Sequence, residues 1–236
     1  MVVAKSSPSL FATFEVVLNT INHMLIGCVT FYMTWLVFAQ PYSLFSLHVI
    51  FCTLGYQLLM AEAILALYSG NAWSSLLLRR QKGHGHLWLQ IGGAILALAG
   101  MWIEVYNKGN RITWKGNHAI FGLLSAIFLI INVILGFITF WSVKLKHLVK
   151  PVYVKLVHNM VGLCCFVFGM VSLYYGYDKG YVKRNVPPEI KTFLEAVCLA
   201  TMILVCLGSM KNISFNFKDA FKGLFRKNNY TDSEAN

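Results

Sequence analysis

The segment from His86 to Gly100, HLWLQIGGAILALAG, decides the fold class of this chain. After His86 the chain stays apolar and carries no charged side chain before Glu104. Such a run approaches the ~20 residues that a helix needs to cross the hydrocarbon core of a bilayer. Because backbone polar groups in lipid must be satisfied within the segment, we expect a transmembrane helix here.

Further apolar runs of similar length lie on both sides of this segment. The expected helices span residues 16–38, 46–68, 86–105, 118–141, 158–177 and 192–210. The 236-residue chain is 57% hydrophobic and only 12% charged, whereas a soluble domain carries about 25% charged residues. The sequence therefore predicts an all-α membrane protein with six transmembrane helices. They form one domain, residues 14–212, and a basic, amphipathic cytosolic tail, residues 213–236, follows it.

Lysine and arginine are distributed unevenly between the connections. Most of them lie in the loops 69–85 and 142–157 and in the C-terminal tail, on the same side as the N-terminus. Positively charged loops stay in the cytosol, so both termini are expected there. The formal net charge of +11 then reflects membrane topology. No arginine-rich stripe or RNA-binding motif points to nucleic acid as a partner.

Four consecutive expected helices each open with a histidine: His48, His86, His118 and His158. The second and fourth helices enter the membrane from the outer side, so His48 and His118 share one depth. The third and fifth enter from the inner side, so His86 and His158 share another. Two imidazoles that face each other at one depth are what a b-type haem needs as axial ligands. The pattern predicts a central four-helix bundle that holds two b haems.

The other histidines are interpreted differently. His23 lies inside the first run and is expected to be a hydrogen-bond partner between helices. His84 lies two residues from His86, about 200° around a helix, so the two cannot face one iron. His147 lies in a basic loop and is expected to be solvated.

Two polar residues are expected at the depth of the inner haem. Glu62 follows His48 by 14 residues, about 21 Å along an α-helix. A carboxyl group at that depth is costly. It could accept a hydrogen bond from a ligand imidazole or relay a proton, or it could be a protonated group bonded within its own helix. Asn132 reaches a similar depth after His118 and is interpreted in the same way.

Two groups of basic residues flank the expected haems as candidate substrate-binding sites. An anionic reductant on the inner side would be attracted to Arg79, Arg80, Lys82, Lys150 and Lys155. An anionic acceptor on the outer side would meet Lys108, Arg111, Trp114 and Lys115. Loop charges of this kind are also explained by membrane topology alone.

Stretches in four of the apolar runs carry a resemblance to a known family. They are SLFSLHVIF with LLMAEAILALYS in the second run, HLWLQIGGAILALAG in the third, NHAIFGLL in the fourth, and LVHNMVGL with GMVSLYYG in the fifth. Together they resemble the cytochrome b561 family, and most closely its short animal D subgroup. The resemblance covers about residues 14–212, and the order of the four histidines is its most specific part. One departure is Val49 after His48, where the subgroup often has proline.

The resemblance implies an oxidoreductase that moves electrons from cytosolic ascorbate to monodehydroascorbate or ferric iron across the bilayer. It implies two b haems, the outer one on His48 and His118 and the inner one on His86 and His158. It also implies a multi-pass protein of the endomembrane system, such as the endoplasmic reticulum or vesicles, rather than the plasma membrane. A homodimer is compatible with it. Two alternatives stay open: a haem-binding subunit that anchors a partner enzyme, and a haem-free transporter lined by His and Glu.

Overall fold

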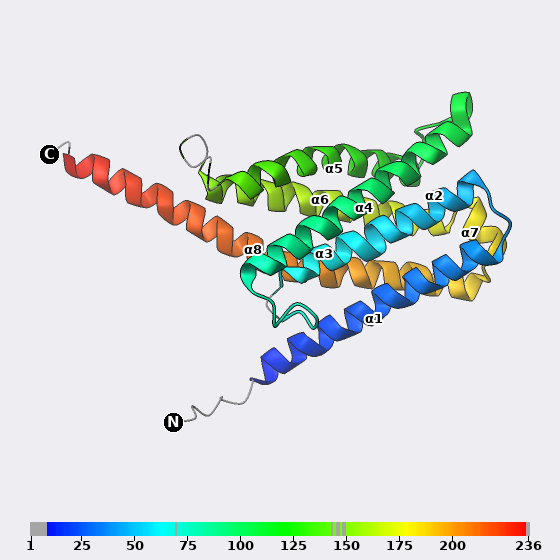
Figure 1. The fold of residues 1–236 in the computed structure, drawn as a ribbon, viewed down its shortest axis with the longest axis horizontal. Coiled ribbons are helices and arrows are strands. Elements are labelled where there is room, and N and C mark those ends of the chain that lie inside the picture. The colour runs from blue at the N-terminus through cyan, green and yellow to red at the C-terminus, as the bar shows by residue number, and fades with distance from the viewer. Residues whose placement is uncertain (1–8, 69, 143, 145–146, 148–149, 235–236) are drawn as a thin grey trace.

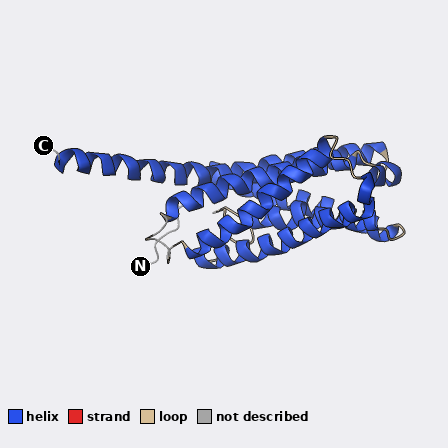
Figure 2. Ribbon diagram, turned by 90° about the horizontal axis from the view of Figure 1, so that it is seen from above, coloured by secondary structure: helices blue, strands red, loops and turns tan. Residues whose placement is uncertain are grey.

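The computed structural model describes residues 9–68, 70–142, 144, 147 and 150–234. Within these ranges the chain forms helices and loops and no strand (Figure 2). The elements in chain order are α1 (Leu10–Ala39), α2 (Leu44–Cys52), the π-helical stretch η1 (Thr53–Met60), α3 (Ala61–Ala66), α4 (Arg79–Lys108), the 3-10 turn η2 (Gly109–Arg111), α5 (Asn117–Trp141), α6 (Pro151–Tyr177), α7 (Gly180–Asn185) and α8 (Pro188–Glu234).

Six segments of the described chain are long and apolar enough to cross a membrane. They are Leu10–Ala39, Leu44–Ala66, Arg79–Arg111, Asn117–Trp141, Pro151–Asn185 and Pro188–Met210. This confirms the prediction of an all-α membrane protein with six transmembrane helices. The start of α1 and the end of α8 lie at the same end of the bundle (Figure 1). We call this the inner end, and we call the opposite end, with the loop between α4 and α5, the outer end.

Several helices extend beyond the predicted apolar runs, because hydropathy marks the part in lipid while the helical backbone continues into polar residues. α4 begins at Arg79, where the side chain of Gln81 accepts the backbone N–H of Leu78 at 2.8 Å. α6 begins with Pro151, a residue whose fixed φ suits the first helical position. α8 continues to Glu234, so the segment 213–236, predicted as a tail, is continuous with the last helix as far as that residue (Figure 1).

The second span is not a uniform α-helix. Ser43 and Ser46 form a capping box at the start of α2, and the helix then widens into η1 before it returns to α-helix in α3. The i→i+5 hydrogen bonds of a π-helix reduce the rotation per residue. Residues after η1 therefore lie on a different face from the one that α-helical spacing predicts.

Close helix contacts build each of the two histidine-bearing halves of the bundle, α2 to α4 and α5 with α6. α5 lies along α6, and α4 packs against α2 and η1 (Figure 1). An added Cβ at Gly55 in η1 would lie 2.9 Å from the backbone nitrogen of Ala97 in α4. α8 packs against α6 and α1. Large apolar side chains such as Phe31, Trp88 and Trp102 are exposed on the outside of the bundle, as expected of a surface that faces lipid.

Candidate functional site

His48 and His118 face each other near the outer end of the bundle. Their ring centroids are 6.0 Å apart and their planes cross at 85°. The Nδ1 atom of His48 lies 2.9 Å from the carbonyl oxygen of Gly100, and that of His118 lies 2.9 Å from the carbonyl oxygen of Ser172. Because a carbonyl oxygen can only accept, both Nδ1 atoms carry a hydrogen, and in the neutral imidazole each Nε2 atom then keeps a free lone pair.

His86 and His158 form a matching pair nearer the inner end. Their ring centroids are 6.3 Å apart, again at 85°. The Nδ1 atom of His86 donates to the carbonyl oxygen of Ala63 at 2.8 Å. The Nδ1 atom of His158 is buried and faces the backbone carbonyl group of Asn132, without a hydrogen bond as well formed as those of the other three rings. The structure thus brings the four entry histidines together in the two pairs that the direction of the helices predicts.

The separation of the rings suits an iron ligated on both sides. Two metal–nitrogen bonds of about 2 Å, on opposite sides of one iron, would hold two imidazole centres about 6 Å apart. Neither pair is joined by a third His, Cys, Asp or Glu in a metal-binding cluster of described residues. Two axial imidazoles are what a haem takes from a protein, since the porphyrin supplies the equatorial ligands. The residues present therefore fit a b-type haem at each pair.

Glycines on the facing helix leave room for two of the rings. An added Cβ at Gly176 in α6 would lie 3.3 Å from Cε1 of His118, and one at Gly136 in α5 would lie 3.3 Å from Cε1 of His158. α5 and α6 are antiparallel, so the histidine near the start of each helix lies opposite the glycine near the end of the other.

Gly176 is a site residue that sequence reasoning missed. Its signal is a repeated spacing, because a glycine follows the histidine by 18 residues on both helices, about five turns and so on one face.

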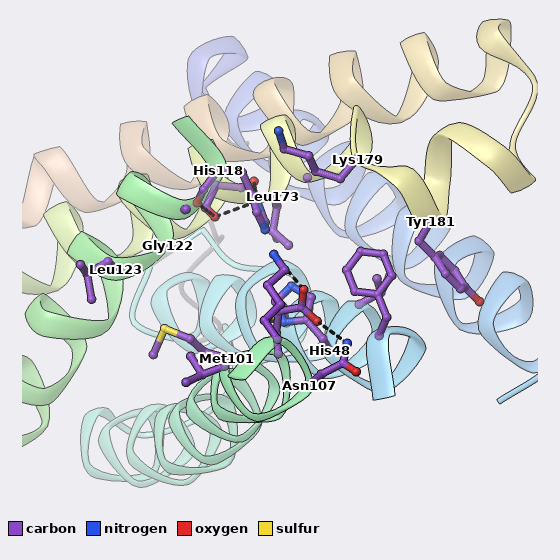
Figure 3. Close-up of a pocket in the computed structure, with 18 of the residues that line it drawn as sticks. His48, Met101, Asn107, His118, Gly122, Leu123, Leu173, Lys179 and Tyr181 are labelled. Atoms are coloured by element: carbon purple, nitrogen blue, oxygen red, sulfur yellow. Dashed lines mark hydrogen bonds and ion pairs between the residues drawn. The ribbon is translucent and has the colours of Figure 1, made fainter. Parts of the chain in front are cut away.

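A cavity of about 640 Å³ opens at the outer pair (Figure 3). His48 and His118 lie in its wall, and apolar residues such as Met101 and Leu173 line it as well. The predicted outer residues all line this cavity: Lys108, Arg111, Trp114 and Lys115. Lys179, just after α6, adds a basic residue that the sequence analysis did not select, and Glu104 forms an ion pair with Lys108 at 3.0 Å.

The predicted inner basic residues lie before the histidines of α4 and α6. Arg79 and Arg80 are exposed at the start of α4, and the Nζ atom of Lys82 lies 3.4 Å from the carbonyl oxygen of Tyr68. Lys150 is exposed directly before α6, where its Nζ atom lies 5.8 Å from the centre of the Tyr153 ring. Lys155 is half-buried within α6, one turn before His158.

Among the described residues, the side chains of Glu62 and Asn132 make no hydrogen bond to any of the four entry histidines. Oε1 of Glu62 lies 2.6 Å from Nδ1 of His23 in α1, and the Nδ1–H of His86 is taken by the backbone of Ala63. The preceding π-helix accounts for this, because it turns Glu62 toward α1. The side chain of Asn132 packs against the bare backbone of Gly162 in α6, where an added Cβ would lie 2.7 Å from Nδ2.

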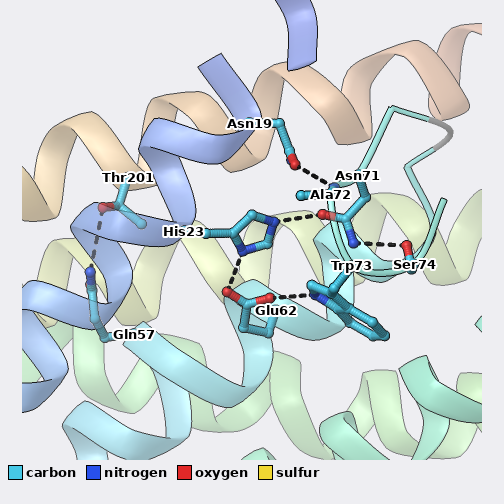
Figure 4. A network of polar contacts seen from close by, with 9 residues as sticks. All are labelled: Asn19, His23, Gln57, Glu62, Asn71, Ala72, Trp73, Ser74 and Thr201. Carbon is cyan, nitrogen blue, oxygen red and sulfur yellow. Dashed lines mark hydrogen bonds and ion pairs between the residues drawn. The ribbon is translucent and has the colours of Figure 1, made fainter. Parts of the chain in front are cut away.

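The remaining histidines follow their interpretation from sequence. His23 hydrogen-bonds Glu62 and Asn71, which confirms it as a polar partner between elements (Figure 4). The ring of His84 lies 6.2 Å from that of Phe140 in α5. His147 is exposed.

Comparison with known proteins gives a match to one family model. The model, described as eukaryotic cytochrome b561, covers residues 47–184, which is more than half of the chain. The matched segment contains all four entry histidines, while α1 and α8 lie outside it. No curated protein and no solved structure matches the chain significantly.

Proposed function

Because the chain belongs to the eukaryotic cytochrome b561 family, a family of haem b membrane oxidoreductases, we propose that it transfers electrons across the bilayer from cytosolic ascorbate to monodehydroascorbate or ferric iron. The observation that carries the proposal is the presence of two perpendicular imidazole pairs at two levels of one bundle. A single pair would hold one redox group, whereas two pairs at different depths suit passage of an electron through the membrane.

In this proposal His48 and His118 hold the outer haem, and His86 and His158 hold the inner one. When bound, the haems supply one-electron redox chemistry. The protein orients the imidazoles through backbone acceptors, namely the carbonyl groups of Gly100, Ser172 and Ala63. Such outer contacts fix the tautomer and the plane of each ligand. Because each pair would give both of its imidazoles to a haem, substrates would approach at the rim of each site, and the charged groups there decide which substrates approach.

The charges at both rims support anionic substrates. On the outer side the cavity combines the two imidazoles with Lys108, Arg111, Lys115 and Lys179, and Trp114 adds an aromatic surface. On the inner side Arg79, Arg80, Lys82, Lys150 and Lys155 precede His86 and His158. Ascorbate and ferric chelates are anions, so a basic rim raises their local concentration.

The positive-inside rule assigns the inner end to the cytosol, with residues 14–212 as the membrane domain and 213–236 as a cytosolic extension of α8. We propose an endomembrane location, with which a homodimer is compatible, on the family resemblance alone.

Absorption spectroscopy with haem quantification tests the proposal directly. We expect two b haems per purified chain, with both reduced by ascorbate. A chain that folds without haem would instead support a transporter, and a chain that binds haem without accepting electrons from ascorbate would support an anchoring subunit. A content of one haem per folded chain would contradict the two-pair arrangement.

Neutralising the inner basic cluster should slow electron entry. In the triple variant Arg79→Gln, Arg80→Gln, Lys82→Gln, stopped-flow reduction by ascorbate should fall by roughly tenfold at low salt, because loss of steering lowers the encounter rate. The loss should shrink at physiological salt, where screening acts over about 8 Å. Haem content should not change, since no imidazole is touched.

The matched control is Lys108→Gln, Arg111→Gln, Lys115→Gln at the outer cavity. It should leave reduction by ascorbate from the inner side unchanged and slow delivery to an anionic acceptor on the outer side. An uncharged reductant should reduce all three proteins equally. If the inner variant accepts electrons from ascorbate at the wild-type rate at every salt concentration, its charges serve topology only.

A further inference from the structure

A polar cluster ties α1 to the loop between α3 and α4 (Figure 4). His23 in α1 lies 2.6 Å from Oε1 of Glu62 and 2.6 Å from Oδ1 of Asn71. The indole N–H of Trp73 donates to Oε2 of Glu62 at 2.9 Å. His23 lies outside the segment that matches the family model, so the two-pair arrangement described above does not use it.

The hydrogen bonds fix where the protons of this cluster lie. The hydroxyl group of Ser74 has one hydrogen, which it donates to the carbonyl oxygen of Ala66 at 2.8 Å. It therefore accepts from Nδ2 of Asn71 at 2.7 Å, so the oxygen of that amide faces His23. An amide oxygen can only accept, which requires a hydrogen on Nε2 of His23.

A second proton must then lie between His23 and Glu62. Nδ1 and Oε1 are 2.6 Å apart, a distance at which two lone pairs would repel each other. Either an imidazolium donates to a carboxylate, or a carboxylic acid donates to a neutral imidazole. Both forms carry the same number of protons, so the geometry requires one shared proton whichever group holds it.

The cluster holds the loop that leads into the inner site. The side-chain oxygen of Asn19 in α1 accepts the backbone N–H of Ala72 at 2.9 Å, beside the contacts of Asn71 and Trp73. The same loop connects to Arg79 at the start of α4, and its Tyr68 carbonyl accepts from Lys82. Ala63, next to Glu62, accepts the Nδ1–H of His86.

We propose that His23 and Glu62 are positioning residues for electron entry, and that their shared proton locks the loop between α3 and α4 so that the basic start of α4 is held beside the inner histidine pair. The inference rests on the proposed function, because it assigns these residues to the approach of the anionic reductant. Neither side chain touches the reductant in this scheme, and both act through the loop.

Four variants of the full-length protein test the proposal. Glu62→Gln should preserve the cluster: its amide N–H can donate to Nδ1 of His23 while its amide oxygen accepts from Trp73, which replaces the shared proton. Glu62→Leu and His23→Phe remove that connection. Thr201→Val is the matched control, because it breaks the buried contact of 3.4 Å between Gln57 and Thr201 without touching the loop (Figure 4).

Two readouts separate the variants. Hydrogen exchange of peptides that cover residues 70–78 should become roughly tenfold faster in Glu62→Leu and His23→Phe, since local opening sets that rate, and should stay at the wild-type rate in Glu62→Gln and Thr201→Val. The KM for ascorbate should rise about fivefold in Glu62→Leu and His23→Phe and should not change in the other two variants. Haem content and the rate with an uncharged reductant should stay unchanged in all four.

Different results overturn different claims. If Glu62→Gln behaves like Glu62→Leu, the shared-proton arrangement is wrong. If the loop exchanges faster in Glu62→Leu while the KM for ascorbate is unchanged, the cluster is structural and does not position the entry site. If wild-type protein binds haem but is not reduced by ascorbate, the proposed function fails, and the exchange data still decide whether the cluster locks the loop.

Discussion

Replacing His118 with alanine is expected to remove one haem from each chain and to leave the other in place. The substitution deletes one of two axial nitrogens at the outer pair, while the inner pair, His86 and His158, keeps its ring separation of 6.3 Å and its own backbone acceptor. Quantified haem should fall from two to one per chain. His48→Ala should give the same product, and His86→Ala or His158→Ala should spare the outer haem instead.

The histidines outside the two pairs supply the controls. His84→Ala and His147→Ala should keep both haems, because the ring of His84 lies against Phe140 and His147 is exposed. Loss of a haem in His84→Ala, together with normal content in His86→Ala, would mean that the inner pair has been assigned to the wrong residue. Loss of both haems in every entry-histidine variant would mean that the two sites do not fold independently.

The spans and the histidine pairs follow from the sequence because each depends on a coarse property. An apolar run long enough to cross the membrane forms a helix, because its backbone polar groups must be hydrogen-bonded within the segment. The depth of a histidine at the start of a span depends only on the direction in which the chain enters the membrane. For that reason the pairs of His48 with His118 and of His86 with His158 need no knowledge of how the helices pack.

The surroundings of the pairs depend on local geometry that hydropathy does not contain. The sequence of η1 carries no signal that distinguishes a π-helix from an α-helix, so the sequence analysis placed Glu62 by its depth alone and did not predict its contact with His23. Lys179 lines the outer cavity from the turn that follows the end of α6 at Tyr177, and hydropathy does not indicate where this turn lies. The helical backbone of α4 begins at Arg79, ahead of the apolar run 86–105, and hydropathy does not indicate this start because the first residues are polar and include Gly83 and Gly85.

Gly55→Leu is expected to have the second large effect, with loss of both haems and a marked fall in stability. A Cβ at this position would lie 2.9 Å from the backbone nitrogen of Ala97 and 3.0 Å from the carbonyl oxygen of Gly93. These are backbone atoms of α4, and no rotamer change can move them away. The helices must separate instead, at a cost of about 1–3 kcal/mol for overpacking, or more for a side chain as large as leucine.

That separation would reach both imidazole pairs, because the contact between η1 and α4 lies between two hydrogen bonds that join the same helices. The Nδ1–H of His48 donates to the carbonyl oxygen of Gly100, and that of His86 donates to the carbonyl oxygen of Ala63.

Gly27→Leu is the matched control, since Gly27 in α1 is exposed and nothing lies within 4 Å of its added Cβ. Thermal unfolding in detergent and haem content should therefore change in Gly55→Leu and not in Gly27→Leu. A Gly55→Leu protein with two haems and an unchanged melting temperature would show that the ligand geometry tolerates movement between these helices, and the two carbonyl contacts would then not be what orients His48 and His86.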